Sequence, residues 1–371
     1  MNENKRLLSL DVLRGFDLFL LVALQPLLRA VLIELNCDAL NGTLLYQLDH
    51  ATWEGVRVWD IVMPLFLFMS GVTMPYSLPK YKNLNGNAKV WRRVLKRFVL
   101  LFLLGMVVQG NILALDVSRI YIYSNTLQAI AVGYLFTVPL VLYMKPKQLL
   151  LVIIALLILY SVPMHLYGDW SAQGNFASIV DKTLLGRFRD GSAVAADGTV
   201  LFAAWYDYTW IWSSLTFCCT VAFGSLAGHI TKSGNCNRGA TAQRLLLVGA
   251  VLLVTGLLAG IDQPIIKRIW TASFTLYSAG WCYLLLALFY WWIDVKGHTK
   301  GWEWLLCFGC NAITAYLIGE VINFRSIAES LLYGTAQYFD GWYPVLLTLC
   351  NSVILFLILK VMYRYRLFLK V

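Results

Sequence analysis

The stretch that decides the fold is LLSLDVLRGFDLFLLVALQPLLRAVLI, residues 7–33. It is long enough to cross the hydrocarbon core of a bilayer, which takes about 20 mostly apolar residues. It nevertheless carries Asp11, Arg14 and Asp17. A charged side chain in a membrane span is costly unless it is paired or reaches water. The sequence therefore predicts a permanent transmembrane helix with one polar side.

The whole chain has the composition of a membrane protein. Hydrophobic residues make up 59% and charged residues only 13%, whereas soluble domains have about 45–50% and 25%. We therefore predict an all-α polytopic bundle, a single domain over 1–371, with about ten spans. They lie near 7–33, 57–79, 98–115, 124–144, 149–166, 208–228, 245–262, 271–293, 304–322 and 343–363.

Basic residues predict the orientation, because cytoplasmic loops are enriched in Lys and Arg. They gather at the N-terminus, near 80–97, 145–147, 232–244 and 296–300, and at the C-terminus. Both termini should be cytoplasmic, and the long loop near 167–207 should face outward. The net charge of +10 then reflects basic loops beside anionic membrane lipid, and no nucleic-acid partner is expected.

The eight cysteines argue against a disulfide scaffold, because most lie in apolar segments. Cys307 and Cys310 have the spacing of a metal or redox pair, but a second pair is lacking. We expect buried apolar cysteines and no metal site.

Polar residues form stripes on several predicted helices. At about 100° per residue, Asp11, Arg14 and Asp17 share an arc of roughly 120°, and Gln25 returns to that face about 16 Å above Arg14. The stripe is either an interhelical ion-pair lattice or the wall of a polar channel. Further candidates for a hydrated pocket begin or follow later spans: Asn125, Gln128, Trp270, Ser273, Asn311 and Glu320.

His50 stands out among the four histidines because polar neighbours surround it. If the segment before the second span is helical, then His50, Trp53 and Glu54 share one face. Asp60 would lie about 15 Å along a straight helix, too far for a direct bond unless the chain folds back. A structural histidine at the membrane interface is the alternative.

These residues belong to a series of motifs that resembles a known family. SLDVLRGFD, HATWEGVRVWDIVMPLFLFMSG, RFVLLFLLG, NTLQAIAVGYL, IWTASFTLYSAGWCYLLLALFYWWID and FGCNAITAYLIGE occur in this order. Together they resemble the heparan-α-glucosaminide N-acetyltransferase family in a compact bacterial form. The resemblance implies a transmembrane acyltransferase domain over the whole chain. It would take acetyl-CoA as co-substrate from the cytoplasm and acetylate an amino sugar of a heparan sulfate-like or other glycan outside the inner membrane. It also implies a homodimer.

The resemblance assigns the family's active histidine to His50, its acid to Asp60 and its first-helix arginine to Arg14. Gln25 stands where the family usually has asparagine. Gln25 and Asn125 are candidate oxyanion donors, and Asp11, Arg14 and Asp17 would line the coenzyme A channel. A charge argument adds three candidates for its phosphates at the inner mouth: Lys96, Arg97 and Arg244.

Two mechanisms and three functions stay open at this point. His50 is either the general base of direct transfer or a transient acetyl carrier, and direct transfer is preferred because no second base stands out beside it. The alternatives to N-acetylation are O-acetylation of an envelope glycan and transport of a sugar or lipid-linked sugar. A transporter would usually show inverted halves, which the sequence does not show.

Overall fold

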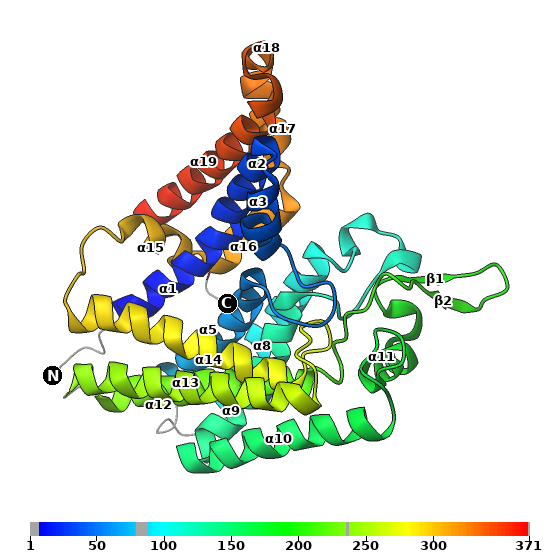
Figure 1. The fold of residues 1–371 in the computed structure, drawn as a ribbon, viewed down its shortest axis with the longest axis vertical. Helices are drawn as coiled ribbons and strands as arrows, with labels where there is room; N and C mark the ends of the chain where they lie inside the picture. Colours follow the sequence, from blue (N-terminus) through cyan, green and yellow to red (C-terminus); the bar gives the residue numbers. More distant parts are fainter. Residues whose placement is uncertain (1–6, 79–87, 235–236, 370–371) are drawn as a thin grey trace. The chain divides into compact units, whose positions relative to one another are not determined.

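The computed structural model describes residues 7–78, 88–234 and 237–369, and they are predominantly α-helical (Figure 1). The chain forms two compact units. The first takes the described residues up to His50, then 57–62, then those from Leu288 on, and the second takes 51–56 and 63–287. The single domain expected over 1–371 stays a prediction, and each unit is described by itself.

The first unit contains both ends of the described chain. Its helices and tight helical turns are α1 (Leu8–Phe19), the π-helical turn η1 (Leu20–Leu24), α2 (Gln25–Leu35), α3 (Asp38–Leu40), η2 (Asn41–Leu45), α4 (Tyr46–Leu48), η3 (Val58–Ile61), η8 (Tyr290–Val295), α15 (Glu303–Cys310), α16 (Ala312–Val321), α17 (Phe324–Leu332), η9 (Tyr333–Thr335), α18 (Ala336–Phe339), η10 (Asp340–Trp342) and α19 (Tyr343–Arg364).

The second unit holds most of the apolar core. Its elements are α5 (Val62–Val72), α6 (Met74–Ser77), α8 (Ala88–Val108), η4 (Ile112–Ala114), η5 (Val117–Arg119), α9 (Thr126–Tyr143), α10 (Pro146–Leu166), α11 (Phe176–Leu185), η6 (Gly186–Phe188), the strands β1 (Ser192–Val194) and β2 (Val200–Phe202), α12 (Ser214–Ser233), α13 (Arg238–Asp262) and α14 (Ala272–Phe289).

The predicted all-α membrane bundle is confirmed. Within the described residues, eight helical stretches are long and apolar enough to span a membrane. A ninth candidate is the pair α15 and α16, which is bent by 74° near Asn311. The eight are Leu8–Leu35, Val58–Ser77, Thr126–Tyr143, Pro146–Leu166, Ser214–Ser233, Arg238–Asp262, Ala272–Val295 and a stretch within Phe324–Arg364.

The span expected at 98–115 differs from the structure. Residues 98–108 belong to α8, which is not among the eight, and α8 ends at Val108. Arg92, Arg93, Lys96 and Arg97 occupy its first half, so its uninterrupted apolar part is only about half the length of a span. Lys96 and Arg97 therefore lie on a helix rather than in the inner loop expected near 80–97, of which 79–87 lie outside the described residues.

Glycines allow α1 and α15 to pack closely in the first unit. A Cβ at Gly15 would lie 2.0 Å from the Leu305 carbonyl oxygen, and one at Gly309 would lie 2.1 Å from the Asp11 carbonyl oxygen. Small residues let helix backbones approach in this way, which is typical of membrane helix pairs. In the second unit, Gly224 of α12 packs against the Phe68 carbonyl of α5 by the same means.

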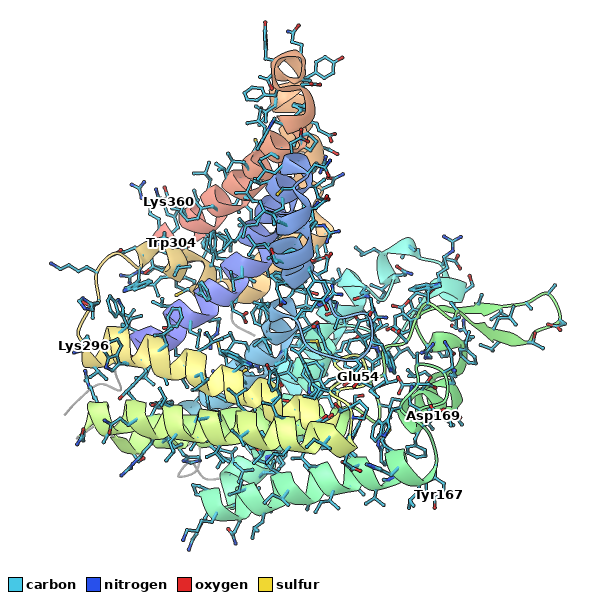
Figure 2. All side chains as sticks on the ribbon, in the orientation of Figure 1. Glu54, Tyr167, Asp169, Lys296, Trp304 and Lys360 are labelled. Carbon is cyan, nitrogen blue, oxygen red and sulfur yellow. The ribbon has the colours of Figure 1, made fainter. Side chains whose placement is uncertain are left out.

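The segment expected as an outer loop near 167–207 is ordered. It contains α11, η6 and the antiparallel hairpin of β1 and β2, in which Ser192 pairs with Phe202 and Val194 with Val200. Tyr167 and Asp169 mark its start at the end of α10 (Figure 2). A positive φ of 85° at Gly198 closes the hairpin turn.

Candidate active site

His50 and Asp60 form a direct hydrogen-bonded pair in the first unit. The Nδ1 atom of His50 lies 2.8 Å from Oδ1 of Asp60. The Asp60 side chain is fully buried, whereas 42% of the His50 side chain is exposed. Oδ2 of Asp60 accepts a hydrogen bond of 3.0 Å from the backbone N–H of Arg57, at the start of η3. Each carboxylate oxygen therefore has a donor, which compensates part of the cost of burying the charge.

This geometry answers two questions that the sequence left open about the His50 segment. The segment is not a helix, because Asp49 is extended and Gly55 has a φ of 98°. The chain folds back between His50 and Asp60, so the direct bond that a straight helix excludes is formed. A residue without a Cβ adopts the left-handed conformation of Gly55 at little cost.

Trp53 and Glu54 consequently do not share a helical face with His50. In the second unit, the indole N–H of Trp53 donates to the carbonyl oxygen of Trp170 at 2.8 Å. Glu54 (labelled in Figure 2) is exposed, and its backbone forms a bridge with Ile266. Gly55 adds a backbone hydrogen bond of 2.9 Å to Ile265. A role for Trp53 and Glu54 in binding a substrate stays a prediction.

Helix α2 contacts the two residues that precede His50. The side-chain amide of Gln25 donates to the carbonyl oxygen of Leu48 at 3.0 Å. One turn further on, the guanidinium of Arg29 forms an ion pair with Asp49. The oxyanion role expected for Gln25 stays a prediction, and its observed partner is the backbone that leads to His50.

Arg57 joins the approach to His50 to the turn that holds Asp60. Its guanidinium donates to the Tyr46 carbonyl oxygen at 3.3 Å and lies 3.8 Å from the centre of the Tyr46 ring. The backbone N–H of Val58 donates to the Gln47 side chain at 3.0 Å. Sequence reasoning missed Arg29 and Arg57, because their partners become neighbours only when the chain folds back.

The polar stripe of α1 contains an ion pair and a buried aspartate. Arg14 lies 3.5 Å from Asp11 in an ion pair one turn apart. Asp17 is fully buried, and its carboxylate has no hydrogen-bond partner among the residues that the structure describes. Between Arg14 and Gln25 the chain passes through the π-helical turn η1, so the regular spacing used to place them on one face does not apply.

Asn125 and Gln128 stabilise the start of α9. The Asn125 side chain accepts the N–H of Leu127 at 2.8 Å and donates to Gln109 at 3.3 Å. The Gln128 side chain accepts the backbone N–H groups of Ser124 and Asn125 at 2.9 and 3.1 Å. These are the bonds of a capping box, and acceptor binding by either amide stays a prediction.

The candidates at α14 are also bonded internally. Trp270 has a φ of 51° and donates from its indole to Thr220 at 3.2 Å, and Ser273 donates to the Pro264 carbonyl at 3.1 Å. These bonds hold the loop before α14.

The two candidates near α16, Asn311 and Glu320, differ in their surroundings. Asn311 donates to the Cys307 carbonyl at 3.4 Å, its own side-chain oxygen has no partner within the described part of the chain, and Glu320 is exposed.

The basic candidates lie on two helices of the second unit. Lys96 is exposed on α8, and Arg97 lies with its guanidinium 4.2 Å from the centre of the Tyr134 ring. Arg244 is exposed on α13. In the ranges that the structure covers, no three His, Cys, Asp or Glu side chains are arranged to hold a metal.

A charged cluster in the segment after α10 was missed by sequence reasoning. Asp181 is buried and accepts the backbone N–H groups of Trp210 and Ile211 at 2.7 and 3.0 Å. Burial raises its pKa to about 7, against those two hydrogen bonds and the charge of nearby Arg189. The sequence signal was an aspartate next to Lys182 in a short amphipathic helix, which is too weak to identify it.

Comparison with known proteins bears on the N-terminal part of the chain. Residues 6–172 match the family model described as heparan-alpha-glucosaminide N-acetyltransferase, catalytic. The match covers a little less than half of the chain, includes His50 and Asp60, and supports membership of that family. No curated protein matches the chain significantly. The long apolar helices indicate a multi-pass membrane protein.

Proposed function

Taking the chain as a member of the heparan-α-glucosaminide N-acetyltransferase family, we propose that it transfers an acetyl group from acetyl-CoA to the amino group of a glucosamine-type sugar. The observation that carries the proposal is the bond between His50 and the buried Asp60, inside the matched residues. The basic residues near the predicted inner loops support a cytoplasmic donor and an acceptor outside the bacterial inner membrane.

The dyad suits the removal of a proton from an amine. When Nδ1 of His50 carries its proton toward Asp60, the basic lone pair of the ring is on Nε2. The amine nitrogen forms a bond to the thioester carbonyl carbon, the carbon–sulfur bond breaks, and His50 passes the proton taken from the amine to the departing coenzyme A sulfur. Asp60 fixes the tautomer and stabilises the imidazolium that forms between these two steps.

Direct transfer is the simpler of the two mechanisms. An acetyl-histidine intermediate would need the amine to be deprotonated by another group while the Nε2 of His50 carries the acetyl. Asp60 is buried and bonded to Nδ1, which suits it to orienting the ring. We propose Lys96, Arg97 and Arg244 as partners for coenzyme A phosphates, and Arg14 with Asp11 and Asp17 beside the path of the pantetheine arm.

The test is acetyl transfer from radiolabelled acetyl-CoA by purified protein in detergent, with glucosamine as acceptor. The variants are His50→Ala and, as a matched control, His165→Ala, because His165 also lies 3.0 Å from an aspartate, Asp262. Transfer that is lost in the first variant and kept in the second supports the proposal.

Other outcomes separate the alternatives. Label on a sugar lacking the amine, and not on glucosamine, would replace N-acetylation with O-acetylation. Absence of coenzyme A binding by the wild-type protein would overturn the acetyltransferase and leave the transporter.

A further inference from the structure

His50 lies outside regular secondary structure, so something else must hold its backbone. The three-residue helix α4 ends at Leu48, and Asp49 follows in an extended conformation with φ of −100° and ψ of 165°. The bond to Asp60 fixes one ring nitrogen of His50. The direction of the ring also depends on how the main chain that leads to His50 is held.

We infer that Gln25 and Arg29 are positioning residues, which hold the backbone of the Leu48–Asp49 step and thereby set the direction of the His50 ring. This inference rests on the proposed function and extends it. The two side chains are four residues apart, so they lie on one face of α2, and they hold two consecutive residues of the segment. Two attachments to adjacent residues fix both the position and the rotation of the chain there.

The opposite end of the dyad is tied to the same segment. Arg57 bonds the Tyr46 carbonyl, Val58 bonds the Gln47 side chain, and the Arg57 N–H holds Asp60. The residues that precede His50 are thus bonded both to α2 and to the turn that contains Asp60. A displacement of about 1 Å in a catalytic group can cost about 100-fold in rate. The bonds that hold this segment should therefore affect catalysis.

The contribution of the two α2 residues should differ. The Gln25 bond is partly buried, whereas the Arg29 and Asp49 side chains are 45% and 40% exposed, and water weakens exposed ion pairs. We expect Gln25→Ala to lower kcat by roughly 10- to 100-fold, as loss of an orienting group commonly does, with KM for acetyl-CoA changed less than about twofold. Arg29→Ala should lower kcat by only about 2- to 5-fold.

A readout besides activity separates positioning from oxyanion stabilisation. His50 is exposed enough to be modified by diethyl pyrocarbonate, and mass spectrometry gives the rate for that residue without any substrate. Positioning predicts a changed rate, and a changed pH dependence of that rate, in Gln25→Ala. An oxyanion donor predicts a lower kcat with both properties of His50 unchanged, and this result would overturn the inference.

Matched controls and a rescue keep the test independent of misfolding. Gln337 also donates to a backbone carbonyl in the first unit, and Arg325 also forms an exposed ion pair, so Gln337→Ala and Arg325→Ala should leave the His50 modification rate unchanged. The exchange of Arg29→Asp with Asp49→Arg should restore the rate lost in Arg29→Ala. If the exchange fails while Arg29→Asp alone matches wild type, the ion pair has no positioning role.

Failure of the proposed function is distinguishable from failure of this inference. If the wild-type protein shows no acetyl transfer, the modification rates of His50 still differ between the Gln25 variant and its control when positioning is correct. Equal rates in all variants would overturn positioning whatever the activity.

Discussion

The chain contains two histidine–aspartate pairs, and their differences show what makes one of them a candidate base. His50 and His165 are similarly exposed, at 42% and 36%, but Asp60 is fully buried and Asp262 is 82% exposed. His165 also has the Ser161 carbonyl 2.9 Å from its Nδ1. Residue type and distance are alike in the two pairs, and the burial of the acid separates them.

The largest expected effect is the loss of the His50 side chain. His50→Ala should lower kcat by roughly 100- to 10,000-fold, the usual contribution of a general base, while His165→Ala should stay within about twofold of wild type. The measurement is acetyl transfer at saturating acetyl-CoA. Equal losses in both variants would contradict the distinction between the pairs.

The next effect concerns the buried acid. Asp60→Asn should lower kcat by about 100-fold, because an amide in place of the carboxylate cannot stabilise the imidazolium and lets the other tautomer form. The matching change in the exposed pair, Asp262→Asn, should leave kcat within about twofold. A pH–rate profile tests the cause, since the limb that reports the base should move only in the first variant.

Asp181 is another buried carboxylate, and it extends the comparison because its hydrogen-bond donors are backbone N–H groups rather than a histidine. Its pKa is raised to about 7, mainly by burial. In the unfolded chain the value is near 3.9, so the folded state binds the proton more tightly. The associated stability is therefore full below about pH 4 and is lost as the pH rises through about 7.

Thermal unfolding in detergent at pH 5 and pH 8 measures this effect. The wild-type Tm should be lower at pH 8 than at pH 5. At about 1.4 kcal/mol per pKa unit, the loss of stability from this group is on the order of 2–4 kcal/mol. Asp181→Asn should flatten that fall while lowering the Tm at pH 5, because Trp210 and Ile211 donate to separate oxygens and the amide replaces one of these with an NH2 group. A fall of the same size in the variant would assign the pH dependence to other groups.

The smallest expected effect belongs to the exposed pair itself. His165→Ala should change the free energy of unfolding by about 1 kcal/mol or less, since exposed ion pairs contribute little. His165 also packs edge-on against Trp170 at 5.0 Å, so part of that loss comes from the ring contact. Asp262→Asn keeps this contact and should leave the Tm nearly unchanged. A large loss in both variants would give this pair a structural importance that its exposure does not predict.

The sequence predicts the membrane helices well because each one carries its own apolar signal, independent of its neighbours. It also singles out His50 and Asp60, through their chemistry and the motif around them. It does not predict their bond, because the chain folds back between them, with a positive φ at Gly55 that local spacing does not specify. The helical face considered for His50, Trp53 and Glu54 does not form, because Asp49 is extended and Gly55 has a positive φ.

Gln25 illustrates a second limit of local reasoning. Its amide is as suitable for an oxyanion as for a peptide carbonyl, and only the folded chain shows that Leu48 is its partner. Arg29 was not singled out for the same reason, because its partner Asp49 is 20 residues away in a segment whose path the sequence does not specify.

The π-helical turn at Leu20–Leu24 makes the length of the first span as important as its composition. An α-helix advances 1.5 Å and turns about 100° with each residue, so deleting one residue from that turn would rotate α2 by about a quarter of a revolution. Gln25 and Arg29 would then point away from Leu48 and Asp49, although neither had been replaced. Insertions and deletions there should consequently be tolerated less well than almost any substitution of the same leucines.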